Sequence, residues 1–294
     1  MDPRGLKGRS PFPFEMIGVM VSLSAGSEEV LAEAGYLANI FGARLLLIQM
    51  GKQTTKLQTA FDTIYERTGT NIQEAARVWL EEMTVKALLT LCKEHSVDLL
   101  ILETIQREGV LRYYLGSLAR GISRAAKCSL LLLTEPKVGG TTFRKIIVSG
   151  VSHPKTSLTL GTAVYFAKQV GAHAIAIVTE LDQPTLSMAT ADMSTVDTLT
   201  NLKQQIVKDE IERIHGIVEC CHPEGLKITE EAIFGRLGYT IRQYARNYGA
   251  DLLVINSPDA KYGIIDRIFT HDMEYILEDL PCNVLIVHSR NSRH

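Results

Sequence analysis

The chain has 294 residues, of which 46% are hydrophobic and 22% are charged, the composition of an ordinary soluble globular protein. Its 31 basic and 33 acidic residues give a formal net charge of −2, which argues against a protein held on nucleic acid or on a membrane surface by bulk charge. No apolar run approaches the roughly 20 residues of a membrane helix, so we expect no membrane insertion. Five irregularly spaced cysteines do not suggest a disulfide framework, which favours the cytoplasm.

Length predicts two domains. The basic, proline-containing residues 1–14 predict a flexible leader, and they hold no apolar segment typical of a secretion signal. We expect a first domain at 15–135 and a second domain at 143–294. The proline- and glycine-containing residues 136–142 between them predict a linker.

The sequence repeats itself. Residues 34–43 and 163–172 share five identical positions at a constant offset of 129. Later, Asp98-Leu-Leu-Ile-Leu matches Asp251-Leu-Leu-Val-Ile at an offset of 153, and the cysteine-led apolar runs near the ends of the two copies match at 154. Two copies of one domain explain these matches, and the change in offset gives the second copy about 25 more residues in its middle.

Hydrophobic periodicity predicts alternating strands and helices in the first copy. The predicted elements are strand Ile17–Ser22, helix Glu28–Phe41, strand Leu45–Met50, helix Asn71–Glu94, strand Leu99–Leu102, helix Leu115–Ala126 and strand Ser129–Leu133. Gly42 stands where a glycine ends a helix. Trp79 falls on the long predicted helix, as a core or interface residue.

The second copy follows the same order with one more strand. Its predicted elements are strand Lys145–Ser149, helix Ser157–Val170, strand Ala174–Val178, a long helix from about Thr195 to Cys220, strand Leu226–Thr229, helix Glu231–Tyr248, strand Leu252–Ile255, helix Arg267–Glu278 and strand Val284–Val287. The strand at 226–229 has no counterpart in the first copy, whose middle is therefore expected to be shorter. Strands joined by helical crossovers predict an α/β fold, with two open, mostly parallel sheets and helices on both faces.

This element order resembles the universal stress protein family in its tandem, two-domain form. The most specific residues are Tyr114-Leu-Gly-Ser117 in the first copy and Pro281-Cys-Asn-Val-Leu-Ile-Val in the second. The resemblance covers about 15–289 and implies an adenine nucleotide alpha hydrolase-like fold. It also implies pairing through the last strands, so we expect Leu130–Leu133 and Val284–Val287 to form the seam of an intramolecular pseudo-dimer, with a further homodimer through edge strands possible.

The nucleotide-binding branch of that family carries Gly-x2-Gly-x9-Gly-Ser/Thr after its fourth strand. Glycines let backbone amides approach a phosphate, and the next helix adds unpaired donors. The first copy keeps Gly109, Gly116 and Ser117, but Glu103 and Gln106 stand at the other glycine positions. The second copy is more degraded: its matching residues are Ser257, Ala260, Gly263, Thr270 and His271.

The same branch has an aspartate that contacts the nucleoside after its first strand. Ser22 and Val151 stand at this position, so neither copy keeps the carboxylate. The candidate site is thus a degenerate nucleotide site of Ser22, Gly109, Gly116 and Ser117. No cofactor is certain, although ATP or AMP remains possible in the first domain.

Other chemically suggestive residues have simpler interpretations. Ser149-Gly-Val-Ser-His-Pro is expected to be a strand-to-helix turn, and His271-Asp272 a helix cap. His215, Cys220, Cys221 and His222 contain groups that suit zinc, but their spacing favours a half-buried helix end. Cys128 and Cys282 precede apolar strands and are expected in the core. We predict no catalytic residue and no metal site.

The leading hypothesis is a non-enzymatic regulatory stress-response protein with a degenerate ATP site and an unidentified protein partner. One alternative is an adenine-nucleotide sensor that binds through the first domain. Another is a soluble regulatory partner of a membrane transporter. An enzyme of the wider nucleotide-hydrolase fold ranks last, because its characteristic loops are absent.

Overall fold

A computed structural model describes residues 10–23, 26–68, 72, 74–82, 84–106, 113–114, 116–182, 196–257 and 273–289. The contacts divide the chain into two compact units, Met1–Thr142 with Asn283–His294, and Phe143–Cys282. The second unit begins at Phe143, where the second domain is expected to begin, whereas the last strand expected in that domain belongs to the first unit. None of the helices in the described ranges is long and apolar enough to cross a membrane.

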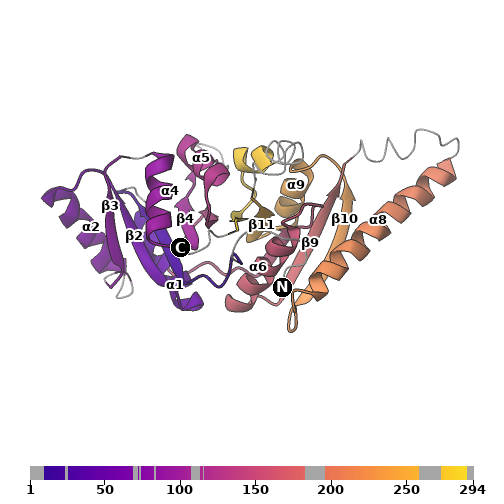
Figure 1. The fold of residues 1–294 in the computed structure, drawn as a ribbon, viewed down its shortest axis with the longest axis horizontal. Coiled ribbons are helices and arrows are strands. Elements are labelled where there is room, and N and C mark those ends of the chain that lie inside the picture. The colour runs from indigo at the N-terminus through magenta and orange to yellow at the C-terminus, as the bar shows by residue number, and fades with distance from the viewer. Residues whose placement is uncertain are drawn as a thin grey trace. The chain divides into compact units, whose positions relative to one another are not determined.

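The first unit is a sheet with helical crossovers (Figure 1). Its elements are β1 (Met16–Val21), α1 (Ser27–Phe41), β2 (Arg44–Met50), α2 (Thr55–Thr68), β3 (Ala76–Leu80), α4 (Val85–Glu94), β4 (Leu99–Glu103), β5 (Ile105–Gln106), β6 (Tyr113–Tyr114), α5 (Ser117–Ala125), β7 (Ser129–Leu133) and β12 (Asn283–Val287). The main sheet has the order β12-β7-β4-β1-β2-β3. All of its neighbours are parallel except β12 and β7.

The central strands consist mostly of apolar residues because the sheet is covered on both faces. Strands β7 and β12 are buried at every position, and β4 at every position but its last. Helix α1 contacts β1 and β2 and ends at Gly42, whose φ of 61° lies in the left-handed region. The predicted C-cap is thus confirmed.

The strands expected to form the seam pair within the first unit. Val284 lies opposite Leu132, and Ile286 opposite Leu130, in an antiparallel ladder. At one end of this ladder, the Asn283 side-chain oxygen accepts a hydrogen bond from the Thr134 amide at 2.9 Å. The homodimer stays a prediction.

The predicted long helix at 71–94 is wrong. Residues 76–80 form the edge strand β3, parallel to β2, and helix α4 begins only at Val85. The Thr84 hydroxyl caps this helix by accepting a hydrogen bond from the Ala87 amide at 3.1 Å. Trp79 therefore lies on a strand. Contrary to prediction, the first unit also has a counterpart of the second unit's outer strand. Its middle is shorter because α2 has 14 residues, whereas the corresponding helix of the second unit, α8 (Val196–Glu219), has 24.

The expected leader and linker are anchored where the structure describes them. Phe14 is buried, and its ring meets Phe41 edge-on with centroids 5.2 Å apart, so a flexible leader reaching residue 14 is wrong. The linker is held by Glu33 of α1, which is fully buried and accepts hydrogen bonds from the Thr141 amide and hydroxyl at 3.0 and 2.7 Å.

The second unit holds a four-stranded parallel sheet of order β10-β9-β8-β11. Its elements are β8 (Lys145–Ser149), α6 (Thr156–Gln169), β9 (Ala174–Leu181), α8 (Val196–Glu219), β10 (Lys227–Phe234), α9 (Tyr239–Tyr248) and β11 (Leu252–Asn256), followed by a helical stretch at 273–278. Helix α6 packs on β8, β9 and β11, and the long α8 runs beside β10 (Figure 1). The predicted helix from Glu231 is wrong at its start, because β10 continues to Phe234 and α9 begins at Tyr239.

Candidate functional site

The candidate site of the first unit lies where parallel strands β1 and β4 end. Ser22 follows β1, and its carbonyl oxygen accepts a hydrogen bond from the Ser27 hydroxyl. Gly116 is the N-cap of α5 and Ser117 is the first residue of that helix, so both stand at an end with unpaired amide donors. Gly109 lies outside the described residues. The structure therefore describes three of the four predicted residues, each at the end of a strand or the start of a helix.

Glu103 supplies a negative charge at this edge. It is the last residue of β4, and its carboxylate lies directly against Gly26, the N-cap of α1. A helix N-terminus carries unpaired N–H groups and a partial positive charge, which favour an anion. Here the anion is the protein's own carboxylate. A phosphate brought to the same place would be repelled by it.

The segment after Glu103 also departs from a phosphate loop. Strands β5 and β6 form an antiparallel ladder, in which Ile105 lies opposite Tyr114 and Gln106 opposite Tyr113. A phosphate loop presents successive amides to its ligand, whereas a ladder directs them toward the opposing strand. These four residues therefore belong to a ladder and not to an open loop, while residues 107–112 and 115 lie outside the described residues.

The corresponding edge of the second unit is filled by a buried polar network. Lys155 is only 4% exposed, and its Nζ donates a hydrogen bond to the Ser257 hydroxyl at 2.8 Å. Next to it, the Asn256 side chain bonds the hydroxyls of Thr159 and Thr156, both buried. Ser257, at the first glycine position, is thus engaged inside the protein. Of the other motif positions in this unit, Ala260, Gly263, Thr270 and His271 lie outside the described residues, as does Asp272.

Glu180 is a residue that the sequence did not single out. It lies near the end of β9 and is 7% exposed, and its carboxylate accepts hydrogen bonds from the amides of Gly238 and Ile241 at 2.9 and 2.8 Å. These amides belong to the first turn of α9. As in the first unit, a carboxylate of the protein occupies a helix N-terminus at the carboxyl edge of the sheet. The sequence signal that could have identified Glu180 is an acidic residue near the end of an apolar strand.

A small cavity lies beside Glu180. It measures about 20 Å³, room for one water molecule, whereas ligand pockets usually measure roughly 300–1,000 Å³. Its lining is mainly apolar and consists of Ser149, Val151, Glu180, Leu237, Gly238, Ile241, Ile255, Met273 and Ile276. This cavity is therefore too small for a nucleobase.

The role of Glu180 can be tested by Glu180→Gln. The substitution keeps the shape of the side chain but replaces an acceptor oxygen by an NH₂ group, which cannot accept from the Gly238 or Ile241 amide. We expect the free energy of unfolding to fall by about 1–2 kcal/mol, the usual cost of a lost helix cap. Urea unfolding followed by circular dichroism measures this. An unchanged midpoint would show that the carboxylate is not needed as a cap.

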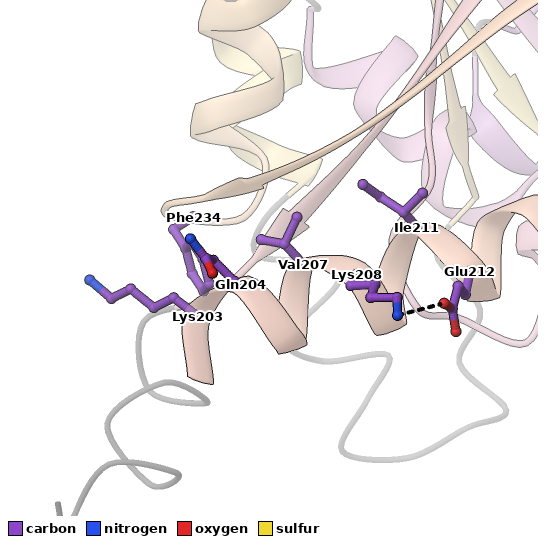
Figure 2. A pocket seen from close by; sticks show the side chains of 7 residues that line it. All are labelled: Lys203, Gln204, Val207, Lys208, Ile211, Glu212 and Phe234. Atoms are coloured by element: carbon purple, nitrogen blue, oxygen red, sulfur yellow. Dashed lines mark ion pairs between the residues drawn. The ribbon is translucent and has the colours of Figure 1, made fainter. Parts of the chain in front are cut away.

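A larger groove lies between α8 and the end of β10. It measures about 540 Å³, and its lining residues are shown in Figure 2. Val207, Ile211 and Phe234 give it an apolar wall, and Lys208 pairs with Glu212 across one helical turn at 3.7 Å. It lies at the outer strand of the sheet and includes none of the predicted site residues.

The cluster at the end of α8 does not form a metal site within the described ranges, where no three ligand-type side chains converge. His215 instead lies 3.2 Å from Glu230, while Cys220 is exposed and Cys221 half-buried. Cys128 and Cys282 are buried, as predicted. A hydrogen bond with Cys92, together with burial, raises the pKa of the Cys128 thiol, and burial raises that of Cys282 to about 12.

Comparison with known proteins identifies one family domain within the chain. The family model described as "Universal stress protein family" matches residues 143–288. Residues 143–288 form a universal stress protein domain. Its last strand, β12, is the one that pairs with β7 in the first unit. No match is found among curated proteins.

Solved structures share the fold over nearly the whole chain. A putative universal stress protein from Pseudomonas aeruginosa UCBPP-PA14 is 14% identical with a TM-score of 0.65, and the match covers 94% of each chain. A universal stress protein from Archaeoglobus fulgidus DSM 4304 is 12% identical with a TM-score of 0.62, covering 95% of this chain and 97% of that one. These likenesses show the predicted α/β fold, with its open, mostly parallel sheets.

Proposed function

We propose that the chain is a tandem universal stress protein, whose residues 15–135 form a second domain of the family, and that it is a non-enzymatic, cytoplasmic regulator in the stress response. Support for the tandem form comes from the structural likenesses, which extend over 94–95% of the chain. The repeat at an offset of 129 residues adds to this support. The regulator acts through protein contacts and does not turn over nucleotide.

One observation carries the regulatory proposal: in each unit a carboxylate of the protein lies at a helix N-terminus on the carboxyl edge of the sheet, the kind of position that also attracts a phosphate. Glu103 lies against the N-cap of α1, and Glu180 accepts from the first amides of α9. A nucleotide would have to bring further negative charge beside these groups. A protein partner would not have to bring negative charge beside these carboxylates, because protein recognition does not need an anion at these positions.

Thermal unfolding of the purified chain with and without millimolar Mg-ATP or AMP tests this proposal. A ligand at about 100 times its dissociation constant adds roughly 2.7 kcal/mol to the domain that binds it, which shifts the midpoint of a domain of about 150 residues by several degrees. We expect no shift with either nucleotide. We also expect no nucleotide to be released when the protein is denatured.

Two variants distinguish the proposal from the nucleotide-sensor alternative, which Gly116 and Ser117 at the start of α5 favour. A shift in the unmodified chain that Gly116→Val abolishes would establish a nucleotide site in the first domain and overturn the proposal. Glu103→Gln removes the charge beside α1 while keeping the side chain's shape. A shift that appears only in this variant would identify the carboxylate as the barrier.

A further inference from the structure

The two accessible thiols of the chain are neighbours in sequence, at the turn that follows α8. Cys220 is exposed and Cys221 is partly exposed, whereas Cys92, Cys128 and Cys282 are buried. A chemical reagent in solution therefore meets these two thiols first. Nothing in the proposed regulatory function uses them.

The backbone at this pair has left the helix. Helix α8 ends at Glu219, the Cys221 amide donates to the Val218 carbonyl at 2.9 Å, and His222 has a φ of 51°. Each thiol donates only to the carbonyl four residues earlier, Cys220 to Gly216 at 3.4 Å and Cys221 to Ile217 at 3.3 Å. Thiols are weak donors, so both side chains can leave these contacts at little cost.

We propose that Cys220 and Cys221 form a thiol–disulfide exchange site for low-molecular-weight disulfides such as oxidised glutathione. In the first step the Cys220 thiolate attacks one sulfur of the small disulfide, which forms a mixed disulfide and releases one thiol. In the second step Cys221 loses its proton to water, attacks the Cys220 sulfur and displaces the second thiol. Two protein thiols are oxidised to a Cys220–Cys221 disulfide, and the small disulfide is reduced to two thiols.

Exposure fixes the order of the two steps. Cys220 is the more open of the pair, and exchange requires access as well as a thiolate. Burial, with a smaller contribution from the neighbouring Cys220, raises the pKa of the Cys221 thiol to about 11. Cys221 is therefore a poor first nucleophile at neutral pH. It becomes effective once the mixed disulfide holds its target on the adjacent residue.

The product is expected to be easily reduced. Adjacent Cα atoms lie about 3.8 Å apart across a trans peptide, closer than the roughly 4.4–6.8 Å of ordinary disulfides. Strained disulfides have higher reduction potentials and are the labile ones. The pair thus oxidises only in an oxidising buffer and returns to two thiols in a reducing one, which suits a protein expected in the cytoplasm.

The test incubates the full-length protein in buffers with different ratios of reduced to oxidised glutathione. Acid then stops the exchange, alkylation blocks the remaining free thiols, and the peptides are identified by mass spectrometry. In the unmodified chain we expect the peptide containing both cysteines to lose two hydrogens and to be restored by reduced glutathione. In Cys221→Ser we expect it to retain one glutathionyl group on Cys220. In Cys220→Ser we expect it to stay unmodified over the same time.

Other outcomes overturn the proposal. A stable mixed disulfide in the unmodified chain would show that Cys221 does not resolve it, and unmodified thiols throughout would show that Cys220 does not react. The pH dependence gives a second check. Because the thiolate fraction of Cys221 rises about tenfold per pH unit below its pKa, conversion of the mixed disulfide should accelerate steeply between pH 7 and 9. A rate independent of pH would contradict attack by Cys221.

Discussion

Replacing Glu33 by glutamine is expected to lower the free energy of unfolding of the first unit by about 3 kcal/mol. The carboxylate is fully buried on α1, and it accepts hydrogen bonds from the Thr141 amide at 3.0 Å and the Thr141 hydroxyl at 2.7 Å. A third bond comes from the Lys137 amide at 3.4 Å. Glutamine has only one acceptor oxygen, so its NH₂ group would face a donor. Hydrogen bonds to a charged group contribute about 1.5–3 kcal/mol each, and a buried donor left unpaired adds a penalty.

Trp79 gives this prediction a local readout. It is the chain's single tryptophan, and its ring lies edge-on to that of Phe61 with centroids 5.6 Å apart, inside the first unit. Urea unfolding followed by tryptophan fluorescence therefore reports this unit. Glu28→Gln is the matched control, because Glu28 lies on the same helix with a side chain that is 43% exposed, and it pairs with the exposed Arg67 at 3.2 Å. We expect the control substitution to change the free energy of unfolding by less than about 0.5 kcal/mol. Equal effects of the two substitutions would contradict a special role for Glu33.

The same residue shows which part of the fold can be predicted from sequence and which cannot. The strands and their sequence along the chain can be predicted from apolar runs such as Ser129–Leu133, because the strands of a parallel sheet covered on both faces must be apolar. The docking of residues 136–142 does not follow, since it depends on a buried glutamate more than 100 positions away in the chain. Glutamate on a helix is ordinarily interpreted as a solvent-exposed residue.

Edge strand β3 illustrates a second limit. Ala76 and Arg77 are exposed, while Val78 and Trp79 are half-buried, which is too little burial to mark a strand against the background of a helical pattern. Its identity comes from pairing with β2, a tertiary contact that outweighs local preference. Helix α2 was missed for a related reason, because only Phe61 and Tyr65 among its residues are buried.

The candidate site could be predicted only in part. The missing glycines at 103 and 106 can be read in the sequence, and a carboxylate near a phosphate position is an evident conflict. The sequence does not show where that carboxylate goes. Its position against Gly26 depends on the alignment of β1 with β4, in which Val19 lies opposite Ile101. The network around Lys155 likewise needs β8 and β11 to be neighbours.

A substitution at Gly150 is expected to cause the second large loss of stability. Glycine is needed at this position because its neighbours leave no room for a Cβ atom. It follows β8, with its amide bonded to the Val178 carbonyl at 2.9 Å. A Cβ at this position would meet the Thr179 hydroxyl and would lie 2.9 Å from Ile214 Cδ1. These neighbours belong to β9 and α8, so neither can move freely. We expect Gly150→Ala to lower the free energy of unfolding by about 2 kcal/mol through overpacking, measured by denaturant titration with circular dichroism.

Gly216→Ala is the matched control for Gly150→Ala, and we expect it to raise the free energy of unfolding instead of lowering it. Gly216 lies within α8, and a Cβ there would meet nothing within 4 Å. Alanine in an exposed helix interior is expected to stabilise by about 0.5–1 kcal/mol. The double substitution Gly150→Ala with Thr179→Ala removes the hydroxyl that the new methyl group would meet. Thr179 is buried and its hydroxyl has no hydrogen-bond partner among the described residues, so its removal breaks no such bond there. The double variant should therefore recover part of the lost stability, and a strictly additive or larger loss would show that the strain at Gly150 lies elsewhere.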